Sequence, residues 1–295
     1  MEMKKVATLF FAAVLTLSLV GCGSNKPAEE SKVSEESVSA GENESEEMST
    51  AAEESEKMEK KDLIVFAAAS MTESLGEVKK LYEEANPNVN VVLNLDSSGT
   101  LKSQISEGAD ADVFISASSK QMNELDKEKD TYNANAAIDS ATRFDLLENQ
   151  VTLAVKEDSN KGITSFEDIN TDKVETIALG NADVPVGQYS EELLKKMDMW
   201  EAIQGKISFA SNVKEVTAWV SEGAVDCGII YSTDAKAAGL KIIDSADSDM
   251  FEKKIIYPAA MVEGSKNSEE AKKFLDFLKS DQAKAVFDKY GFKTH

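Results

Sequence analysis

Four places in the chain combine small or hydroxyl-bearing residues with the start of an expected helix. Ser70 follows an apolar strand pattern and three alanines, and Ser98 follows a second strand pattern. Residues 183–189 and 211–215 enter helical patterns in a similar way. The first turn of a helix has about four backbone N–H groups without intrahelical partners and carries partial positive charge. Helix starts that meet would form a site rich in N–H and O–H donors, which suits a small oxyanion.

Helix capping is the simpler explanation of each of these segments taken alone. Ser70 with Glu73, and Asn212 with Glu215, have the three-residue spacing of a capping box. The sequence also places Tyr231 at the end of the apolar run 228–231, where its phenol could reach the same edge of a sheet. Spacing alone does not show whether these segments meet in space.

The residue types argue against several classes of enzyme. The only histidine, His295, is the last residue, so the folded part lacks a Ser-His or Cys-His pair and a His-based zinc site. An enzyme with Ser70 or Ser98 as nucleophile would need another base, and we expect no lysine at the site. Cys227 lies in an apolar run, where a free cysteine is typically a small buried hydrophobe.

Short apolar runs alternate with amphipathic helical patterns along most of the chain. This alternation predicts an α/β fold with largely parallel sheets. Strands are expected at residues 63–67, 89–95, 113–116, 151–155, 177–179, 228–231 and 255–262. Helices are expected at residues 71–85, 100–107, 118–127, 190–197, 200–203, 213–222, 268–279 and 281–290.

The N-terminal part has the pattern of a bacterial lipoprotein. Residues 1–21 combine two early lysines with an apolar run of about 15 residues, shorter than the ~20 that a membrane-spanning helix needs. Cys22 directly follows Gly21 and is the expected lipid attachment site. Residues 22–61 lack aromatic residues, Leu and Ile and carry excess Glu, which predicts a disordered acidic linker. The folded part is then residues 62–295.

The charge of the chain argues against an anionic polymer as its partner. The 54 acidic residues outnumber the 32 Lys and Arg, and the net charge is −22. Nucleic acids and anionic membrane surfaces attract strongly basic proteins. We therefore expect no nucleic-acid partner, although a small buried anion responds to local dipoles and remains compatible with this charge.

Six segments carry a family resemblance: residues 65–70 (VFAAAS), 97–101 (SSGTL), 109–117 (ADADVFISA), 184–189 (VPVGQY), 228–231 (GIIY) and 257–260 (YPAA). In this order and spacing they resemble the bacterial molybdate-binding protein of the molybdate ABC importer. The resemblance implies a two-lobed periplasmic-binding-protein fold of type II, with the ligand in the cleft between the lobes. Lobe 1 would comprise about residues 62–145 and 240–295, and lobe 2 about residues 146–239.

The resemblance also implies the ligand-binding residues, which are Ser70, Ser98, Val186, Val213 and Tyr231. The serines would donate through hydroxyl and amide, the valines through backbone N–H and the tyrosine through its phenol. Gly99 stands where the family commonly has a third serine, which could change the size or hydration of the pocket. None of the five positions is acidic, so the site should favour fully deprotonated oxyanions over phosphate, which keeps a proton at neutral pH.

The function implied by the resemblance is capture of molybdate, and also of tungstate, outside the cell. The chain, anchored by lipid to the outer face of the cell membrane, would deliver the ion to an ABC-type permease. It would be a monomer without cofactor or catalytic activity, and the metal would be bound as its oxyanion with no direct metal-ion ligands. A sulfate-binding protein and an oxyanion-sensing module that reports to a membrane receptor remain alternatives.

Overall fold

The computed structural model describes residues 60–294 of the chain. The expected signal peptide (1–21), the lipidation residue Cys22 and almost all of the expected linker lie outside the described residues, as does His295. Within the described part, no helix has the length and apolar character needed to cross a membrane.

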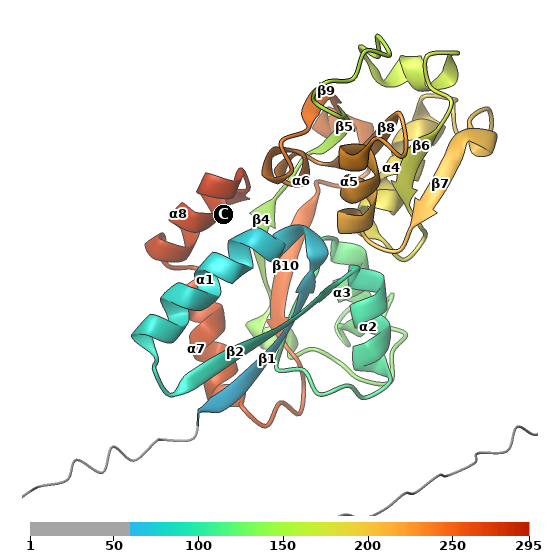
Figure 1. Ribbon diagram of the computed structural model, residues 1–295. Helices are drawn as coiled ribbons and strands as arrows, with labels where there is room; N and C mark the ends of the chain where they lie inside the picture. Colours follow the sequence, from blue (N-terminus) through green and yellow to red (C-terminus); the bar gives the residue numbers. More distant parts are fainter. Residues whose placement is uncertain (1–59, 295) are drawn as a thin grey trace, which may run out of the picture. The chain divides into compact units, whose positions relative to one another are not determined.

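The first sheet has six strands in the order β11-β4-β10-β3-β1-β2. Figure 1 labels β4, β10, β1 and β2 of this sheet. Its strands are β1 (Lys61–Ala68), β2 (Val89–Asp96), β3 (Val113–Ile115), β4 (Phe144–Glu148), β10 (Ile256–Met261) and β11 (Lys293–Thr294). β1 pairs in parallel with β2 and β3, whereas β10 runs antiparallel to β3 and β4. The carboxyl ends of β1, β2 and β3 therefore lie at one edge.

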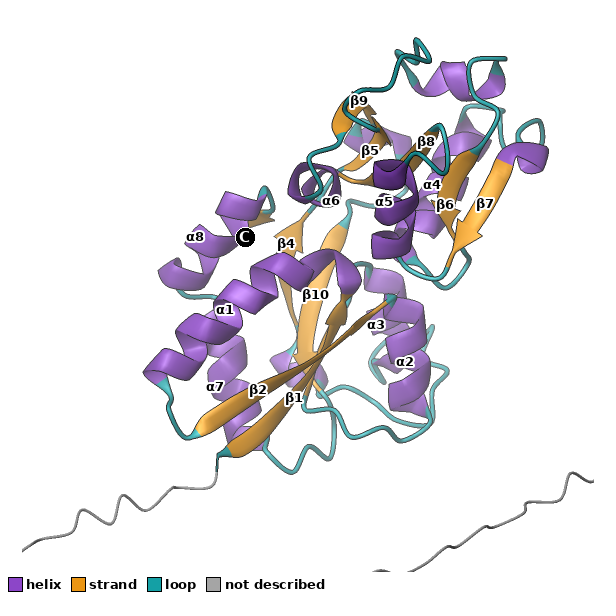
Figure 2. Cartoon of the chain, in the orientation of Figure 1, coloured by secondary structure: helices purple, strands orange, loops and turns teal. Residues whose placement is uncertain are grey.

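Helices cover both faces of this sheet, as Figure 2 shows. The helices are α1 (Thr72–Ala85), α2 (Ser98–Ser106), α3 (Ser119–Leu125), α7 (Ser268–Leu278) and α8 (Asp281–Tyr290). Along β1, Phe66 packs in a small apolar cluster with Leu101 of α2 and Met122 of α3. Its neighbour Val65 belongs to the main core with Leu75 of α1. The alternation along the strand thus directs successive side chains to opposite helical layers.

The second sheet has five strands in the order β7-β6-β8-β5-β9. Its strands are β5 (Val151–Val155), β6 (Ile177–Gly180), β7 (Ile207–Ala210), β8 (Cys227–Tyr231) and β9 (Lys241–Ser245), and its helices are α4 (Pro185–Lys196), α5 (Val213–Glu222) and α6 (Ser232–Ala237). The chain also has short 3-10 helices η1 (Ala69–Met71), η2 (Ser140–Thr142), η3 (Phe166–Asn170), η4 (Gln204–Lys206) and η5 (Ser248–Met250). β5 and β8 are buried along their whole length, as their continuous apolar sequences predict.

The two sheets define two lobes. We call the first sheet with its helices lobe 1 and the second sheet with its helices lobe 2. The chain leaves lobe 1 after β4, through Asn149 and Gln150, and returns between β9 and β10. β9 pairs with β5, so the second sheet extends to Ser245, beyond the expected boundary at residue 239. β4 likewise extends the first sheet to Glu148, beyond the expected boundary at residue 145.

Several details of the expected secondary structure were wrong. Both sheets are mixed, because β10 in lobe 1 and β5 in lobe 2 run antiparallel to their neighbours. Residues 200–203 form turns instead of a helix, since the chain leaves α4 through Asp198 in a left-handed conformation with φ of 56°. Four strands and one α-helix were not predicted from the sequence, and all are short and have polar or exposed positions: β4, β7, β9, β11 and α6.

Candidate functional site

A small cavity lies between the lobes at the carboxyl ends of β1, β2 and β8. Its volume is about 10 Å³, measured as the space open to the centre of a water-sized sphere. It is lined by Ala68, Ala69, Ser70, Asp96, Ser97, Ser98, Ala117, Pro185, Val213 and Tyr231. Four of the five predicted ligand-binding residues are therefore together, and the fifth, Val186, directly follows the lining residue Pro185. Both lobes contribute to the lining.

Ser70 reaches the cavity from the 3-10 helix η1, which links β1 to α1. It does not cap α1: the N-cap of α1 is Met71, and no side chain caps that position. The Ser70 Oγ instead lies 3.0 Å from the phenolic oxygen of Tyr257. The expected capping box of Ser70 with Glu73 was wrong, because the short 3-10 turn moves the start of α1 beyond Ser70. This leaves the serine as a buried polar group beside the cavity.

Ser98 is the first residue of α2, and its neighbour Ser97 is the N-cap. The Ser97 Oγ accepts a hydrogen bond from the backbone N–H of Thr100, so capping and cavity lining are divided between adjacent serines. The Ser98 Oγ accepts a hydrogen bond of 2.9 Å from the N–H of Ala117. A hydroxyl that accepts in this way still has its own hydrogen to donate. Ser98 is fully buried, so that hydrogen needs a partner inside the site.

Val186 and Val213 lie in the first turns of α4 and α5, where backbone N–H groups have no intrahelical partner. No side chain caps α4. Gly187 allows the start of α4 to lie against β6, because a Cβ there would be 2.2 Å from the carbonyl oxygen of Gly180. In α5, Asn212 accepts from the N–H of Glu215, which confirms the predicted cap. The Glu215 carboxylate, however, accepts from Ser211, so the reciprocal half of the capping box was wrong.

Two buried phenols lie close together where the lobes meet, and one of them, Tyr231, lines the cavity. Tyr231 ends β8, and its hydroxyl donates to the carbonyl oxygen of Ala117 at 3.4 Å. Tyr257 accepts from the Asn149 side chain at 3.0 Å, and its ring packs edge-on against Tyr231. Burial, reinforced by nearby negative charge, raises the pKa of both phenols well above 10. Both therefore stay protonated near neutral pH and can act as hydrogen-bond donors.

Tyr257 lies in the segment 257–260, but no role was predicted for it. Its contact with Ser70 joins residues 187 positions apart, so no local pattern could have revealed it. The one feature of the sequence that singles out Tyr257 is its position directly before Pro258 in an otherwise apolar strand.

One carboxylate also lines the cavity, contrary to the expected shell of donors alone. Asp96, at the end of β2, accepts through Oδ1 from the backbone N–H of Ser97 at 2.7 Å. The same oxygen accepts from the side-chain amide of Asn212, in lobe 2, at 3.3 Å. Asp96 thus links the lobes, and its negative charge makes the cavity less uniformly suited to anions than the sequence indicated.

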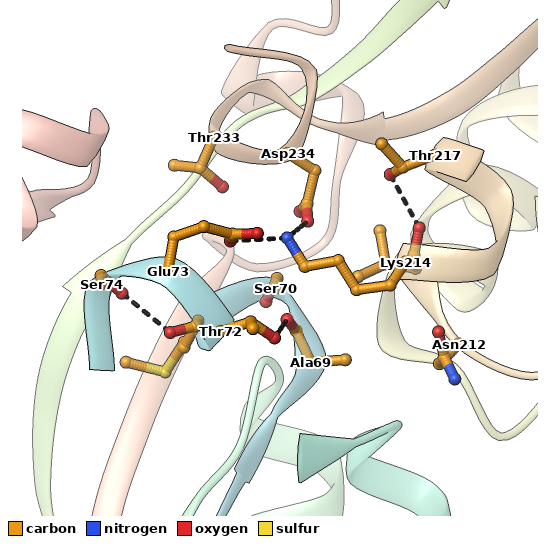
Figure 3. Close-up of polar contacts among 12 residues, drawn as sticks. Ala69, Ser70, Thr72, Glu73, Ser74, Asn212, Lys214, Thr217, Thr233 and Asp234 are labelled. Carbon is orange, nitrogen blue, oxygen red and sulfur yellow. Dashed lines mark hydrogen bonds and ion pairs between the residues drawn. The ribbon is translucent and has the colours of Figure 1, made fainter. Parts of the chain in front are cut away.

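Lys214 lies between the carboxylates of Glu73 and Asp234, as Figure 3 shows. Its Nζ is 2.7 Å from Glu73 of α1 and 3.0 Å from Asp234 of α6. Lys214 does not itself line the cavity, but it directly follows the lining residue Val213. Glu73 belongs to lobe 1, whereas Lys214 and Asp234 belong to lobe 2. The three charges together form an ion-pair cluster that crosses the interlobe boundary.

The charge states of this cluster follow from burial and from the neighbouring charges. Burial raises the pKa of the Asp234 carboxyl to about 6, although Lys214 acts in the opposite direction. For Lys214, burial favours the neutral amine, but Asp234 and Glu73 outweigh that effect and raise its pKa. Lys214 is consequently protonated near neutral pH. A protonated lysine cannot serve as the base that a serine nucleophile would require.

A second, larger cavity lies beside the chain crossings between the lobes. Its volume is about 590 Å³, and it is lined in part by Asn149, Lys236, Phe251 and Lys254. None of the predicted ligand-binding residues lines it. Within residues 60–294, no group of three or more His, Cys, Asp or Glu is arranged to hold a metal ion. The small interlobe cavity therefore remains the candidate site.

Residues 63–293 match the family described as bacterial extracellular solute-binding proteins. This chain belongs to that family. The match spans both lobes and the cavity between them, and it confirms the predicted two-lobed α/β fold of type II. It also places the chain among proteins that bind solutes, which is not a class of enzymes.

Individual members of the family agree with this assignment. The chain is 34% identical to the Bacillus subtilis lipoprotein YvgL, provisionally named an ABC transporter substrate-binding lipoprotein, over 98% of this chain and 99% of that protein. It is 36% identical to the molybdate-binding protein ModA of Haemophilus influenzae, over 78% of this chain and 89% of that protein. Among solved structures, the substrate-binding domain of a provisionally assigned molybdenum ABC transporter from Clostridium difficile superimposes with a TM-score of 0.60 at 35% identity. That alignment covers 79% of this chain and 99% of the other.

Proposed function

We propose that this protein captures molybdate outside the cell and delivers it to an ABC-type permease. The observation that carries the proposal is the interlobe cavity, in which Ser70, Ser98, Val213 and Tyr231 come together from both lobes. The relatives named as molybdate-binding proteins support the choice of ligand.

The donors around the cavity match a tetrahedral dianion. Ser70, Ser98 and Tyr231 supply hydroxyls, and Val186 and Val213 supply amides at helix starts. A hydrogen bond to a charged group contributes about 1.5–3 kcal/mol, and a helix terminus adds roughly 0.3–1 kcal/mol. Several such contacts together offset much of the hydration that a dianion loses on burial. Because lobe 2 supplies part of the donor set, the ligand favours the closed arrangement of the lobes.

Tungstate is a second ligand of the same site under this proposal, since it is also a fully deprotonated tetrahedral dianion. Phosphate differs because it carries a proton at neutral pH and gains from a free carboxylate acceptor. The Asp96 carboxylate already accepts two hydrogen bonds through Oδ1, one of them across the lobes. We assign Asp96 to holding the closed lobes together, and we expect the hydroxyl and amide donors around the cavity to favour molybdate over phosphate.

Calorimetric titration of the whole chain with molybdate, tungstate, sulfate and phosphate at pH 7.5 tests the ligand assignment. The expected result is tight binding of molybdate and tungstate and at least 100-fold weaker binding of phosphate. Comparable affinities for molybdate and phosphate would refute the assignment. Tighter binding of sulfate than of molybdate would instead identify a sulfate-binding protein.

The same proposal includes attachment to the outer face of the cell membrane through a lipid on Cys22. The apolar run that ends before Cys22 supports it, and so does the lipoprotein name of the Bacillus subtilis relative that aligns over 98% of the chain. A single acyl chain anchors weakly, so a diacylglycerol at Cys22 is the physically adequate anchor. Cys22→Ser should move the protein from the detergent phase to the aqueous phase. Retention of Cys22→Ser in the detergent phase would refute this attachment.

A further inference from the structure

We propose that Gly99 determines how far the two lobes close on the ligand, an inference that rests on the proposed function of the cavity. Gly99 is the second residue of α2 in lobe 1 and adjoins the cavity residue Ser98. Its backbone N–H donates a hydrogen bond of 3.0 Å to the carbonyl oxygen of Asp183 in lobe 2. This is a direct backbone contact between the lobes, one residue away from the cavity.

No other residue type fits at Gly99 while the lobes are in this position. A Cβ at Gly99 would lie 2.3 Å from the Asp183 carbonyl oxygen and 2.9 Å from its carbonyl carbon. Both neighbours are backbone atoms, which cannot rotate away as the end of a flexible side chain could. The side chain that even alanine carries would therefore require the two backbones to separate.

The backbone segments on both sides of this contact are held in place within their own lobes. In lobe 2, Asn181 donates to the carbonyl oxygen of Ala210 at 2.8 Å, and its side chain accepts from the N–H of Asp183 at 2.8 Å. In lobe 1, Ser97 caps the start of α2. Because neither segment can shift freely within its lobe, separation of the lobes is the response that relieves the overlap.

Separation at Gly99 would enlarge the cavity that its neighbour lines. Ser98 from lobe 1 and Pro185 and Val213 from lobe 2 face the same small volume. A hydrogen bond weakens steeply as donor and acceptor move beyond their normal distance. An opening that lengthens the contacts from one lobe therefore lowers affinity even though every ligand-binding residue is still present. The glycine thus acts as a positioning residue that the local donor pattern does not reveal.

The test compares Gly99→Ala with Gly76→Ala in the full chain. Gly76 lies in α1 of the same lobe, and a Cβ there would meet nothing within 4 Å. Molybdate affinity and dissociation rate are measured by calorimetry and stopped-flow fluorescence, and the radius of gyration at saturating molybdate by X-ray scattering. Gly99→Ala should raise Kd at least tenfold, mainly through faster dissociation, and should increase the radius of gyration of the ligand-bound protein. Gly76→Ala should leave Kd within twofold of the unmodified chain.

The melting temperature without ligand separates an effect on lobe closure from a local folding defect. Gly99→Ala should leave it close to that of the unmodified chain, because the contact joins lobes that fold around separate sheets. Unchanged affinity and radius of gyration in Gly99→Ala would overturn the inference while leaving the proposed function intact. If another oxyanion proves to be the ligand, the same relative weakening is expected for it. If the unmodified chain binds none of the four oxyanions, both the proposed function and the inference about Gly99 are refuted.

Discussion

The Nζ atom of Lys214 lies 2.7 Å from Oε2 of Glu73, and the two residues belong to different lobes. They are 141 positions apart in the sequence, and both adjoin residues of the candidate site. Lys214 directly follows Val213, and Glu73 lies one turn beyond Ser70. The ion pair therefore forms beside the ligand cavity and only when the lobes are close, so it should affect how long a ligand is held.

Replacing Glu73 by Gln should speed dissociation of molybdate. The side chains of Lys214 and Glu73 are 29% and 41% exposed, so the pair is partly screened and contributes only about 0.2–1 kcal/mol. The dissociation rate should rise by a factor of about 1.4 to 5. The matched control is Glu77→Gln, four residues along α1, where the carboxylate pairs with Lys289 inside lobe 1. Both variants lose one negative charge, and equal dissociation rates in the two would contradict a role for the interlobe pair.

Ser70→Ala should weaken molybdate binding without a large loss of stability. The hydroxyl contacts Tyr257 and caps no helix, and Tyr257 keeps its hydrogen bond from Asn149 in the variant. Loss of one hydrogen bond to a charged ligand, about 1.5–3 kcal/mol, corresponds to a roughly 10- to 100-fold higher Kd. Calorimetry and the melting temperature without ligand measure the two effects separately.

The control for this prediction is Ser74→Ala, in the first turn of the adjoining helix α1. The buried Ser74 hydroxyl donates to the carbonyl oxygen of Met71 and does not line the cavity. This variant should lower the melting temperature and leave Kd unchanged. The opposite pattern, with Ser70→Ala affecting stability and not affinity, would show that Ser70 is a structural residue.

Arg143→Met should destabilise the fold and leave ligand affinity unchanged. Arg143 donates to Oδ2 of Asp126 at 2.7 Å, and Ser140 donates to Oδ1 of the same carboxylate. The Asp126 side chain is 2% exposed, so the variant leaves a buried carboxylate without its ion-pair partner. The expected loss is about 3–5 kcal/mol of unfolding free energy, measured by urea denaturation. Lys266→Met, in an exposed pair with Asp110, is the control and should cost little.

The same carboxylate makes stability fall in acid. Burial favours the protonated form of Asp126, but hydrogen bonds from Ser140 and Arg143 outweigh it and lower the pKa. The unfolded chain therefore binds a proton at the Asp126 carboxylate more readily than the native protein does. The stabilisation is therefore present above the unfolded pKa of about 3.9 and is lost as pH falls through the lower native value.

The sequence predicted those parts of the fold that depend on local patterning. The strand β5 and the helices α5 and α8 begin and end at the predicted residues, since an uninterrupted apolar run or a clear helical period marks each of them. Edge strands such as β7 and β9 were missed, because one side of an edge strand is exposed and its sequence need not be apolar. Parallel or antiparallel pairing was also not encoded locally, and the mixed sheets follow from long-range connections.

The candidate site was predictable where helix starts could be recognised, and not where the two lobes touch. Ser98 and Val213 stand at the starts of α2 and α5, which are capped by Ser97 and Asn212. Of these two caps, only Asn212 was predicted. The Gly99–Asp183 contact and the Lys214–Glu73 pair join segments from different lobes, so they depend on how the lobes meet. Assignment of the five ligand-binding residues remains a prediction that the substitutions above examine.

Binding of molybdate near pH 6.5 should be accompanied by proton uptake at Asp234. This buried carboxylate on α6 is paired with Lys214 of α5, which also faces Glu73 of α1, and its charge is felt by Tyr231 and Tyr257 of the interlobe region. Its pKa of about 6 is raised by burial, and a dianion nearby disfavours the ionised form further and raises it again. A group whose pKa rises on binding takes up a proton, so affinity should increase as pH falls from 7.5 towards 6.

Calorimetry in two buffers with different ionisation enthalpies measures this proton uptake. The apparent binding enthalpy should depend on the buffer at pH 6.5 and become independent of it near pH 8, where Asp234 is ionised with or without ligand. Asp234→Asn should abolish the dependence, whereas Asp110→Asn, at an exposed carboxylate of lobe 1, should preserve it. A binding enthalpy that is equal in both buffers at pH 6.5 would show that Asp234 does not change its protonation when the ligand binds. The stability of the ligand-free protein should follow the same group. The native state binds a proton at Asp234 more tightly than the unfolded chain does. The contribution of Asp234 to the free energy of unfolding therefore declines as pH rises from about 4 to 6.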